Sequence, residues 1–174
     1  MNNKTEYFYF KPKENKEGYQ LFSSDINLNS CAKKFFFSTY DNLYNIIKTN
    51  KYNHYYEDNT FAKSIKLFVD IDENRSFTTE LERDLNGKQI LDQTLLSINN
   101  KLLSVFNITS SKFIILISDT LTKLSYHIIF PEIVFNNIYE MKYFMEDIPI
   151  IDQSVYKTGC FRMLYNSKIG KNNN

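Results

Sequence analysis

The segment Ile65–Asp72 reads IKLFVDID, an apolar run of strand length that ends in two carboxylates one residue apart. Such a run predicts a buried β-strand. A buried carboxylate without a partner is unfavourable, so we expect a partner for this charge at the strand end. Because strand side chains alternate between faces, Asp70 and Asp72 share one face, while Val69 and Ile71 point to the other.

The composition is that of a folded domain with an unremarkable global charge. The chain has 174 residues, 43% of them hydrophobic and 16% aromatic, and its net charge is +1. This apolar content supplies a core and argues against wholesale disorder. A polyanionic partner would therefore have to be recognised by a local cluster of charge.

Basic residues are almost all lysine, and the only arginines are Arg75, Arg83 and Arg162. This skew is typical of an AT-rich genome, so lysine abundance alone indicates no function. An arginine can still bind phosphate through its planar fork, which lysine lacks.

The two cysteines, Cys31 and Cys160, lie far apart without a metal-ligand spacing. They indicate neither a zinc site nor a disulfide framework, and they fit a reducing, intracellular setting. The N-terminus lacks the apolar stretch of a signal peptide, and no segment approaches the length of a membrane span. We expect a soluble protein without a membrane partner.

Strand and helix patterns alternate along the chain, which predicts a mixed α/β or α+β sheet protein. Apolar residues at helical spacing predict a helix in the range 80–106. The other expected elements are strands at 7–10, 19–22, 112–118 and 123–130, a helix-like end to 31–48, a helix at 136–147 and an extended segment at 148–156. The polar, tyrosine-rich stretch 48–60 is the predicted boundary between an N-terminal module and the rest.

Polar side chains also gather on one face of the predicted strand KLSYHIIF. Lys123, Ser125 and His127 fall on that face and can all donate hydrogen bonds to an anionic oxygen. The strand therefore offers a phosphate-binding strip, and the alternative is an ordinary polar strand face. For Asp70 and Asp72, the corresponding alternatives are a site for a divalent cation such as Mg²⁺ and a solvated strand end.

A third group follows the apolar run IPII, where Asp152 offers another carboxylate. Arg162, Lys168 and Lys171 come later along the chain. A basic segment after a carboxylate can hold a triphosphate whose metal ion the carboxylate helps to bind. A basic surface tail is the alternative, and it fits Lys171 better than Arg162, which lies in the apolar context CFRML.

Taken in order, the motifs VDID, SYH and ID resemble those of the archaeo-eukaryotic primase superfamily. That superfamily carries D-x-D or D-x-E, then S-x-H, then a hydrophobic residue followed by Asp. The segment VYKTGCFRMLYNSKIGK is similar to a stretch of eukaryotic primase-polymerases and of primase-helicases from large nucleocytoplasmic DNA viruses. The resemblance extends over about residues 65–171, and the AT-rich composition favours the viral branch.

The resemblance implies an α+β primase catalytic core. Residues 1–60 would form a small N-terminal α/β module, residues 61–171 an RRM-like catalytic module with a mixed or antiparallel sheet, and residues 172–174 a disordered tail. The implied activity is metal-dependent nucleotidyl transfer from nucleoside triphosphates on a single-stranded DNA template in DNA replication. The implied partners are template, primer and nucleotides, with a helicase as a further candidate, and the setting is the infected-cell cytoplasm, a virus factory or the nucleus.

The resemblance also assigns roles to individual residues. Asp70, Asp72 and Asp152 would bind two Mg²⁺ or Mn²⁺ ions and, with His127, form the catalytic set. The implied contacts to the incoming nucleotide come from Lys123, Ser125, His127, Arg162 and Lys168.

The sequence departs from the family pattern in three places. A basic residue expected before the FR pair falls near Thr158–Cys160, which contains none, and an arginine of the N-terminal module has only Lys33 or Lys34 as a counterpart. The sequence also ends directly after the third motif, without a zinc-binding module or a helicase. Two alternatives therefore stay open: a catalytically silent module that binds nucleotide or single-stranded DNA, and a metal-dependent nuclease using the same carboxylates.

Overall fold

A computed structural model of the chain describes residues 7–27, 32–50 and 53–163, and these fall into two compact units. The first unit comprises Met1–Lys63 and Thr158–Asn174, and the second comprises Ser64–Lys157. Both contain antiparallel sheets with helices, so the fold is of the α+β type.

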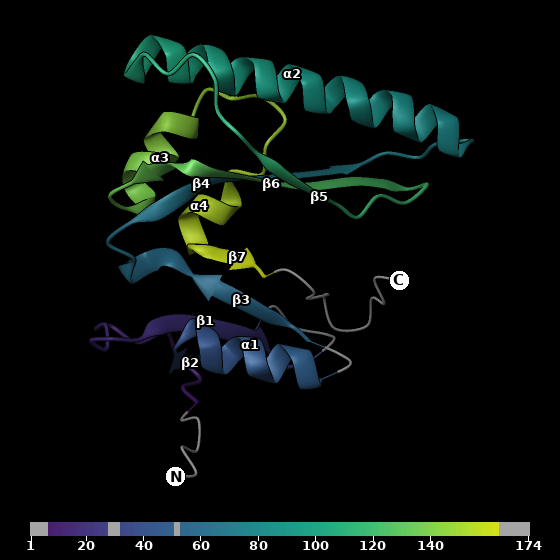
Figure 1. Ribbon diagram of the computed structural model, residues 1–174. Helices are drawn as coiled ribbons and strands as arrows, with labels where there is room; N and C mark the ends of the chain where they lie inside the picture. The colour runs from purple at the N-terminus through teal and green to yellow at the C-terminus, as the bar shows by residue number, and fades with distance from the viewer. Residues whose placement is uncertain (1–6, 28–31, 51–52, 164–174) are drawn as a thin grey trace. The chain divides into compact units, whose positions relative to one another are not determined.

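The first unit is built on a four-stranded antiparallel sheet in the order β2-β1-β3-β7 (Figure 1). Its elements are β1 (Gln20–Asp25), β2 (Lys33–Ser38), α1 (Tyr40–Thr49), β3 (Tyr55–Asp58), the 3₁₀ helix η1 (Asn59–Phe61) and β7 (Cys160–Arg162). The hydroxyl oxygen of Thr39 accepts the backbone N–H of Asn42 and so caps the start of α1. The core of this unit is a cluster of buried apolar side chains from the strands and α1: Phe22, Phe36, Leu43 and Ile47.

The second unit is a three-stranded sheet in the order β4-β6-β5. Its elements are β4 (Ile65–Asn74), α2 (Glu80–Phe106), β5 (Ile114–Ile117), β6 (Lys123–Phe135), α3 (Ile138–Met145) and α4 (Ser154–Thr158). Both β4 and β5 pair antiparallel with β6, which is therefore the central strand. A crossover through α2 thus joins two parallel strands that are separated by β6 (Figure 1).

The long helix α2 packs one stripe of its surface on this sheet. The buried stripe consists of Gly87, Ile90, Thr94, Ile98 and Leu102, which recur at helical spacing. The stripe includes a glycine because the sheet comes very close there: a Cβ atom on Gly87 would lie 2.0 Å from the hydroxyl oxygen of Tyr126 on β6. The helix lies on one face of the sheet, and Asp70 and Asp72 of β4 and Ser125 and His127 of β6 lie on the other.

The sequence predicted most of the second unit. The expected helices at 80–106 and 136–147 and the two strands joined by the DTLT turn are present as α2, α3, β5 and β6. The extended segment expected at 148–156 forms no strand; turns and the short helix α4 occupy it instead.

In the first unit the predictions were less accurate. The helix expected at the end of 31–48 is present as α1, and the strand β2 precedes it. The strand expected at 7–10 is reduced to one bridge between Phe8 and Phe35. The predicted second module reached residue 171, but Cys160–Arg162 pairs with β3 and belongs to the first unit. A three-residue strand is too short for its sequence pattern to predict which strand it pairs with.

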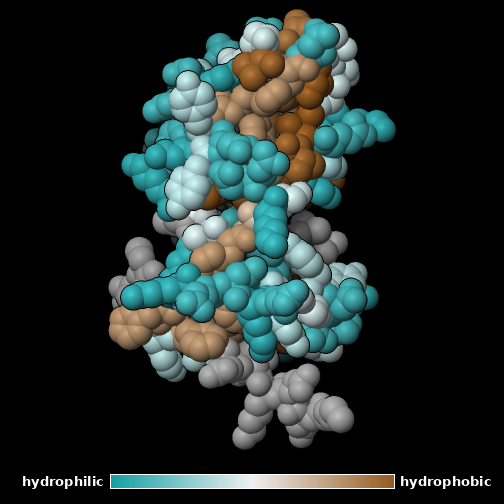
Figure 2. Space-filling model, turned by 90° about the vertical axis from the view of Figure 1, so that its left-hand side faces the viewer, coloured by the Kyte–Doolittle hydropathy of each residue, from teal (hydrophilic) through white to brown (hydrophobic). Residues whose placement is uncertain are grey.

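Two surface properties complete the description. Among the described residues, no helix combines the length and apolar character needed to cross a membrane. Figure 2 shows apolar side chains gathered over part of the second unit, and Leu103, Val105 and Phe106 near the end of α2 are exposed. Exposed apolar side chains are common on proteins, so this surface indicates no function by itself.

Candidate functional site

The pairing of β4 with β6 brings two of the predicted motifs together. In the register of the two strands, Asp70 lies directly opposite His127 and Asp72 directly opposite Ser125. Directly opposed residues of an antiparallel pair share one face, so the VDID and SYH motifs form a single polar strip. Val69, Ile71 and Tyr126 point to the other face, on which α2 packs.

Two side-chain contacts run across this strip. The Nε2 atom of His127 lies 3.2 Å from Oδ1 of Asp70, and Nζ of Lys123 lies 2.5 Å from Oδ1 of Asp72. The side chains of Asp70 and His127 are only 15% and 13% exposed, whereas those of Asp72 and Lys123 are 28% and 23% exposed. The strip thus has a more buried end at Asp70 and a more open end at Asp72.

Asp152, which supplies the third predicted carboxylate, contacts the strip through its main chain. The backbone N–H of Asp152 donates to the carbonyl oxygen of Asp70 over 2.8 Å. The Asp152 carboxylate itself accepts the backbone N–H of Ser154 at 2.8 Å, next to the start of α4. Asp152 is therefore tied to the edge of β4 at the position of Asp70.

A buried tyrosine anchors α4 beside these two aspartates. The hydroxyl of Tyr156, a residue only 1% exposed, donates to the carbonyl oxygen of Phe68 at 2.8 Å. Its ring stacks on that of Phe68 with 5.5 Å between centroids. Burial raises the pKa of Tyr156 above its usual range, and the carboxylates of Asp70 and Asp152 raise it further. The phenol therefore stays protonated and keeps donating its hydrogen bond.

The turn before Asp152 contains a strained residue. Ile150 has a φ of 69°, a left-handed conformation that β-branched residues rarely adopt. It lies two residues before Asp152, and strained backbone of this kind is concentrated at functional sites.

The strip has donors suited to Mg²⁺ or Mn²⁺. Magnesium is commonly held by one or two carboxylates together with substrate phosphates, and Asp70 and Asp72 supply two such groups on one face. The Oδ1 atom of Asp70 is buried and lies 3.2 Å from Nε2 of His127, so a cation bound to this oxygen would replace that contact. The two carboxylates fit a hard cation.

The described residues contain no group of three His, Cys, Asp or Glu side chains that could hold a metal ion. The three-carboxylate arrangement of Asp70, Asp72 and Asp152 therefore stays a prediction, supported by the main-chain contact between Asp70 and Asp152.

The remaining predicted contacts belong to the first unit or lie outside the described residues. Arg162 is on β7 opposite Tyr56, with its guanidinium carbon 5.8 Å from the Tyr56 ring centroid. Lys33 pairs with Asp25 at 2.8 Å, and Lys168 lies outside the described residues. Arg162 and Lys168 keep their predicted roles as proposals only.

A buried carboxylate of the first unit was not expected from the sequence. Asp58 is fully buried, and its Oδ2 atom lies 2.8 Å from Nζ of Lys11 and accepts the Cys160 thiol at 3.4 Å. Burial and the Asp58 charge raise the pKa of Cys160 to about 11, against the smaller opposing effects of Ser23 and Lys11. The cluster joins the N-terminal segment, β3 and β7.

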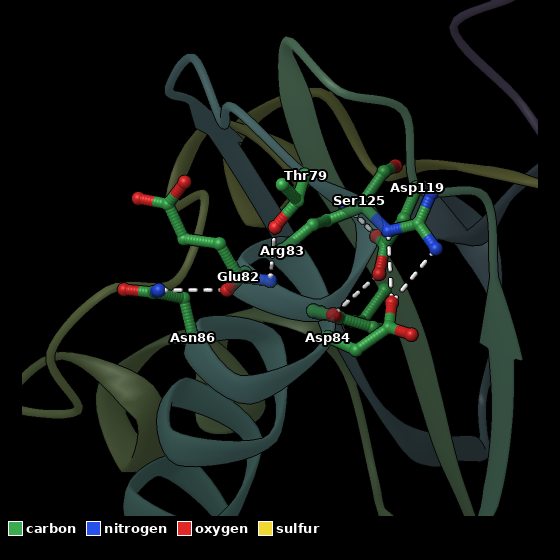
Figure 3. A network of polar contacts seen from close by, with 8 residues as sticks. Thr79, Glu82, Arg83, Asp84, Asn86, Asp119 and Ser125 are labelled. Atoms are coloured by element: carbon green, nitrogen blue, oxygen red, sulfur yellow. Dashed lines mark hydrogen bonds and ion pairs between the residues drawn. The ribbon is translucent and has the colours of Figure 1, made fainter.

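Sequence reasoning also missed Asp119, which lies beside the strip. Its carboxylate accepts the backbone N–H of Ser125 (Figure 3). It also accepts the hydroxyl of Tyr126. Its position at the start of the DTLT turn was the available signal, since Asp is favoured where a side chain can bond a nearby backbone N–H.

Comparison with known proteins assigns no family to this arrangement. Neither a protein-family model nor a curated protein sequence matches the chain.

Proposed function

We propose that this chain is a catalytic domain of the archaeo-eukaryotic primase type, a DNA primase or primase-polymerase that transfers nucleotides from nucleoside triphosphates onto a growing strand. The observation that carries the proposal is the register of β4 and β6, which sets Asp70 opposite His127 and Asp72 opposite Ser125. Motifs more than fifty residues apart in the sequence thus form one strip of carboxylates, imidazole, hydroxyl and ammonium. The succession β4-α2-β5-β6-α3 supports the RRM-like module that the resemblance implies.

Each residue of the strip has a chemical task in this proposal. Asp70 and Asp72, with Asp152, would hold Mg²⁺ or Mn²⁺, which when bound neutralises charge on the transferring phosphoryl group. Lys123, Ser125 and His127 would donate hydrogen bonds to the triphosphate oxygens. Lys123 and His127 pair with Asp72 and Asp70 in the structure, so they lie within reach of any phosphate that those carboxylates share through a cation.

The test is a primer-extension assay on single-stranded DNA with nucleotides and Mg²⁺ or Mn²⁺. We expect product from the wild type and a loss of at least about a hundredfold in Asp70→Asn and in His127→Ala, the scale on which acid–base and positioning groups act. Glu73→Gln is the matched control, because Glu73 lies on the same strand but on the opposite face, across from Leu124. Unchanged extension by Asp70→Asn would refute the assignment.

A silent nucleotide-binding module is the second candidate, because both carboxylates of the strip already contact side chains of the strip itself, Asp72 that of Lys123 and Asp70 that of His127. In that case the protein would bind triphosphate, and binding would weaken in Lys123→Ala, but a supplied primer would not be extended. Degradation of DNA without any dependence on nucleotides would instead indicate a metal-dependent nuclease.

A further inference from the structure

We propose that Asp119 is a positioning residue of this site: its carboxylate holds the β5–β6 turn so that Ser125 and Lys123 contact the triphosphate from fixed positions. The inference rests on the proposed function, because it concerns the nucleotide that the strip would bind.

The carboxylate of Asp119 bonds two consecutive residues that point to opposite faces of the sheet. Its Oδ1 atom accepts the backbone N–H of Ser125 at 2.7 Å (Figure 3). Its Oδ2 atom accepts the hydroxyl of Tyr126 at 2.5 Å. The carbonyl oxygen of Ser125 accepts the N–H of Ser118 at 2.9 Å. The side chain of Asp119 therefore continues the hydrogen bonding of the β5–β6 pair where the turn begins.

The bond to Tyr126 connects this turn with α2. Tyr126 is 4% exposed, and its hydroxyl fills the space left by the missing side chain of Gly87. Burial and the charge of Asp119 both raise the pKa of Tyr126, so its hydroxyl remains a donor to that carboxylate. One carboxylate thus links the helix-covered face of β6 to the main chain of Ser125.

Further hydrogen bonds of the turn fix the main chain of Lys123. The backbone N–H of Thr120 donates to the carbonyl oxygen of Lys123 at 2.8 Å. The backbone N–H of Phe77 donates to the carbonyl oxygen of Leu121, in the same turn, at 2.7 Å. Lys123 then reaches Asp72 across the strip. Releasing Asp119 would therefore loosen the segment that presents both Lys123 and Ser125.

An aspartate that merely closes a turn would give the same contacts, so the experiment has to separate positioning from stability. We would measure KM and kcat for the nucleotide in primer extension with Asp119→Ala, Asp119→Asn, Tyr126→Phe, Ser125→Ala and the double variant Asp119→Ala/Ser125→Ala. The Asn variant keeps an oxygen that can accept the Ser125 N–H, and Tyr126→Phe removes only the bond on the α2 side.

We expect Asp119→Ala to raise KM about tenfold, the effect of one hydrogen bond to a charged group, with a smaller change in kcat. Asp119→Asn should restore most of the affinity, and Tyr126→Phe should leave KM within about twofold while lowering the urea midpoint. In the Ser125→Ala background, Asp119→Ala should raise KM less than in the wild type, because part of its effect acts through Ser125.

An unchanged KM in Asp119→Ala, or the same increase in both backgrounds, would overturn the inference while leaving the proposed function intact. A wild type that makes no product would refute the proposed polymerase activity. The same variants would then be compared by their Kd for ATP, and an absence of ATP binding or a Kd unaffected by Asp119→Ala would overturn this inference as well.

Discussion

Replacing Gly87 by Ala tests the packing of α2 against β6, because this packing decides whether the free energy of unfolding rises or falls. At an open helix position, replacing Gly by Ala stabilises a protein by about 1 kcal/mol, because Ala has the higher helix propensity. At Gly87 the new methyl would lie 2.0 Å from the Tyr126 hydroxyl oxygen, 3.2 Å from its ring carbon Cζ and 3.4 Å from Leu124 Cδ2. The hydroxyl must therefore move, and its bond to Asp119 is lost.

These contributions give an expected net effect. Overpacking costs about 1–3 kcal/mol, and losing a hydrogen bond to a charged group costs about 1.5–3 kcal/mol. Against a propensity gain of about 1 kcal/mol, Gly87→Ala should lower the free energy of unfolding by about 1.5–5 kcal/mol. In a Tyr126→Phe background the nearest remaining ring atom is 3.2 Å away, so the same substitution should be close to neutral.

The assay is urea unfolding followed by far-ultraviolet circular dichroism on the two single variants and the double variant. The double-mutant cycle should give a coupling of about 2 kcal/mol between positions 87 and 126. Asn100→Ala, at an exposed position of α2, is the control and should stabilise by a few tenths of a kcal/mol. Stabilisation by Gly87→Ala in the wild-type background would refute the described packing of α2 on Tyr126.

Two further predictions concern single residues. In a Cys31→Ser background, the rate at which Cys160 reacts with iodoacetamide should rise with pH as its thiol ionises near pH 11, well above the ordinary pKa of 9. Asp58→Asn should shift this rise to lower pH, because it removes a charge that raises the thiol pKa. A profile centred at or below pH 9 with Asp58 unchanged would contradict the burial described. Ile150→Gly should raise the free energy of unfolding by about 0.5–1 kcal/mol in urea titrations, because Gly adopts a φ of 69° without strain. The control Ile151→Gly should lower the free energy of unfolding. Destabilisation by both substitutions would argue against strain at Ile150.

The sequence predicted the parts of the site that depend on local periodicity. Alternation along VDID and SYH placed Asp70 with Asp72, and Ser125 with His127, each on one strand face, and the apolar spacing in 80–106 predicted α2. These features follow from geometry within one element. The alternation of a strand is fixed by its own backbone, so no distant residue is needed to infer it.

Only the tertiary structure decided which of these residues meet. The register that sets Asp70 opposite His127 depends on pairing between distant strands, and a shift of one residue would turn one partner's side chains to the other face. The pairing of β7 with β3, the two bonds of Asp119 and the space that Tyr126 takes at Gly87 also join segments that no local pattern connects. The sequence by itself therefore determined which side chains each element presents, and long-range packing determined which of them lie together as a site.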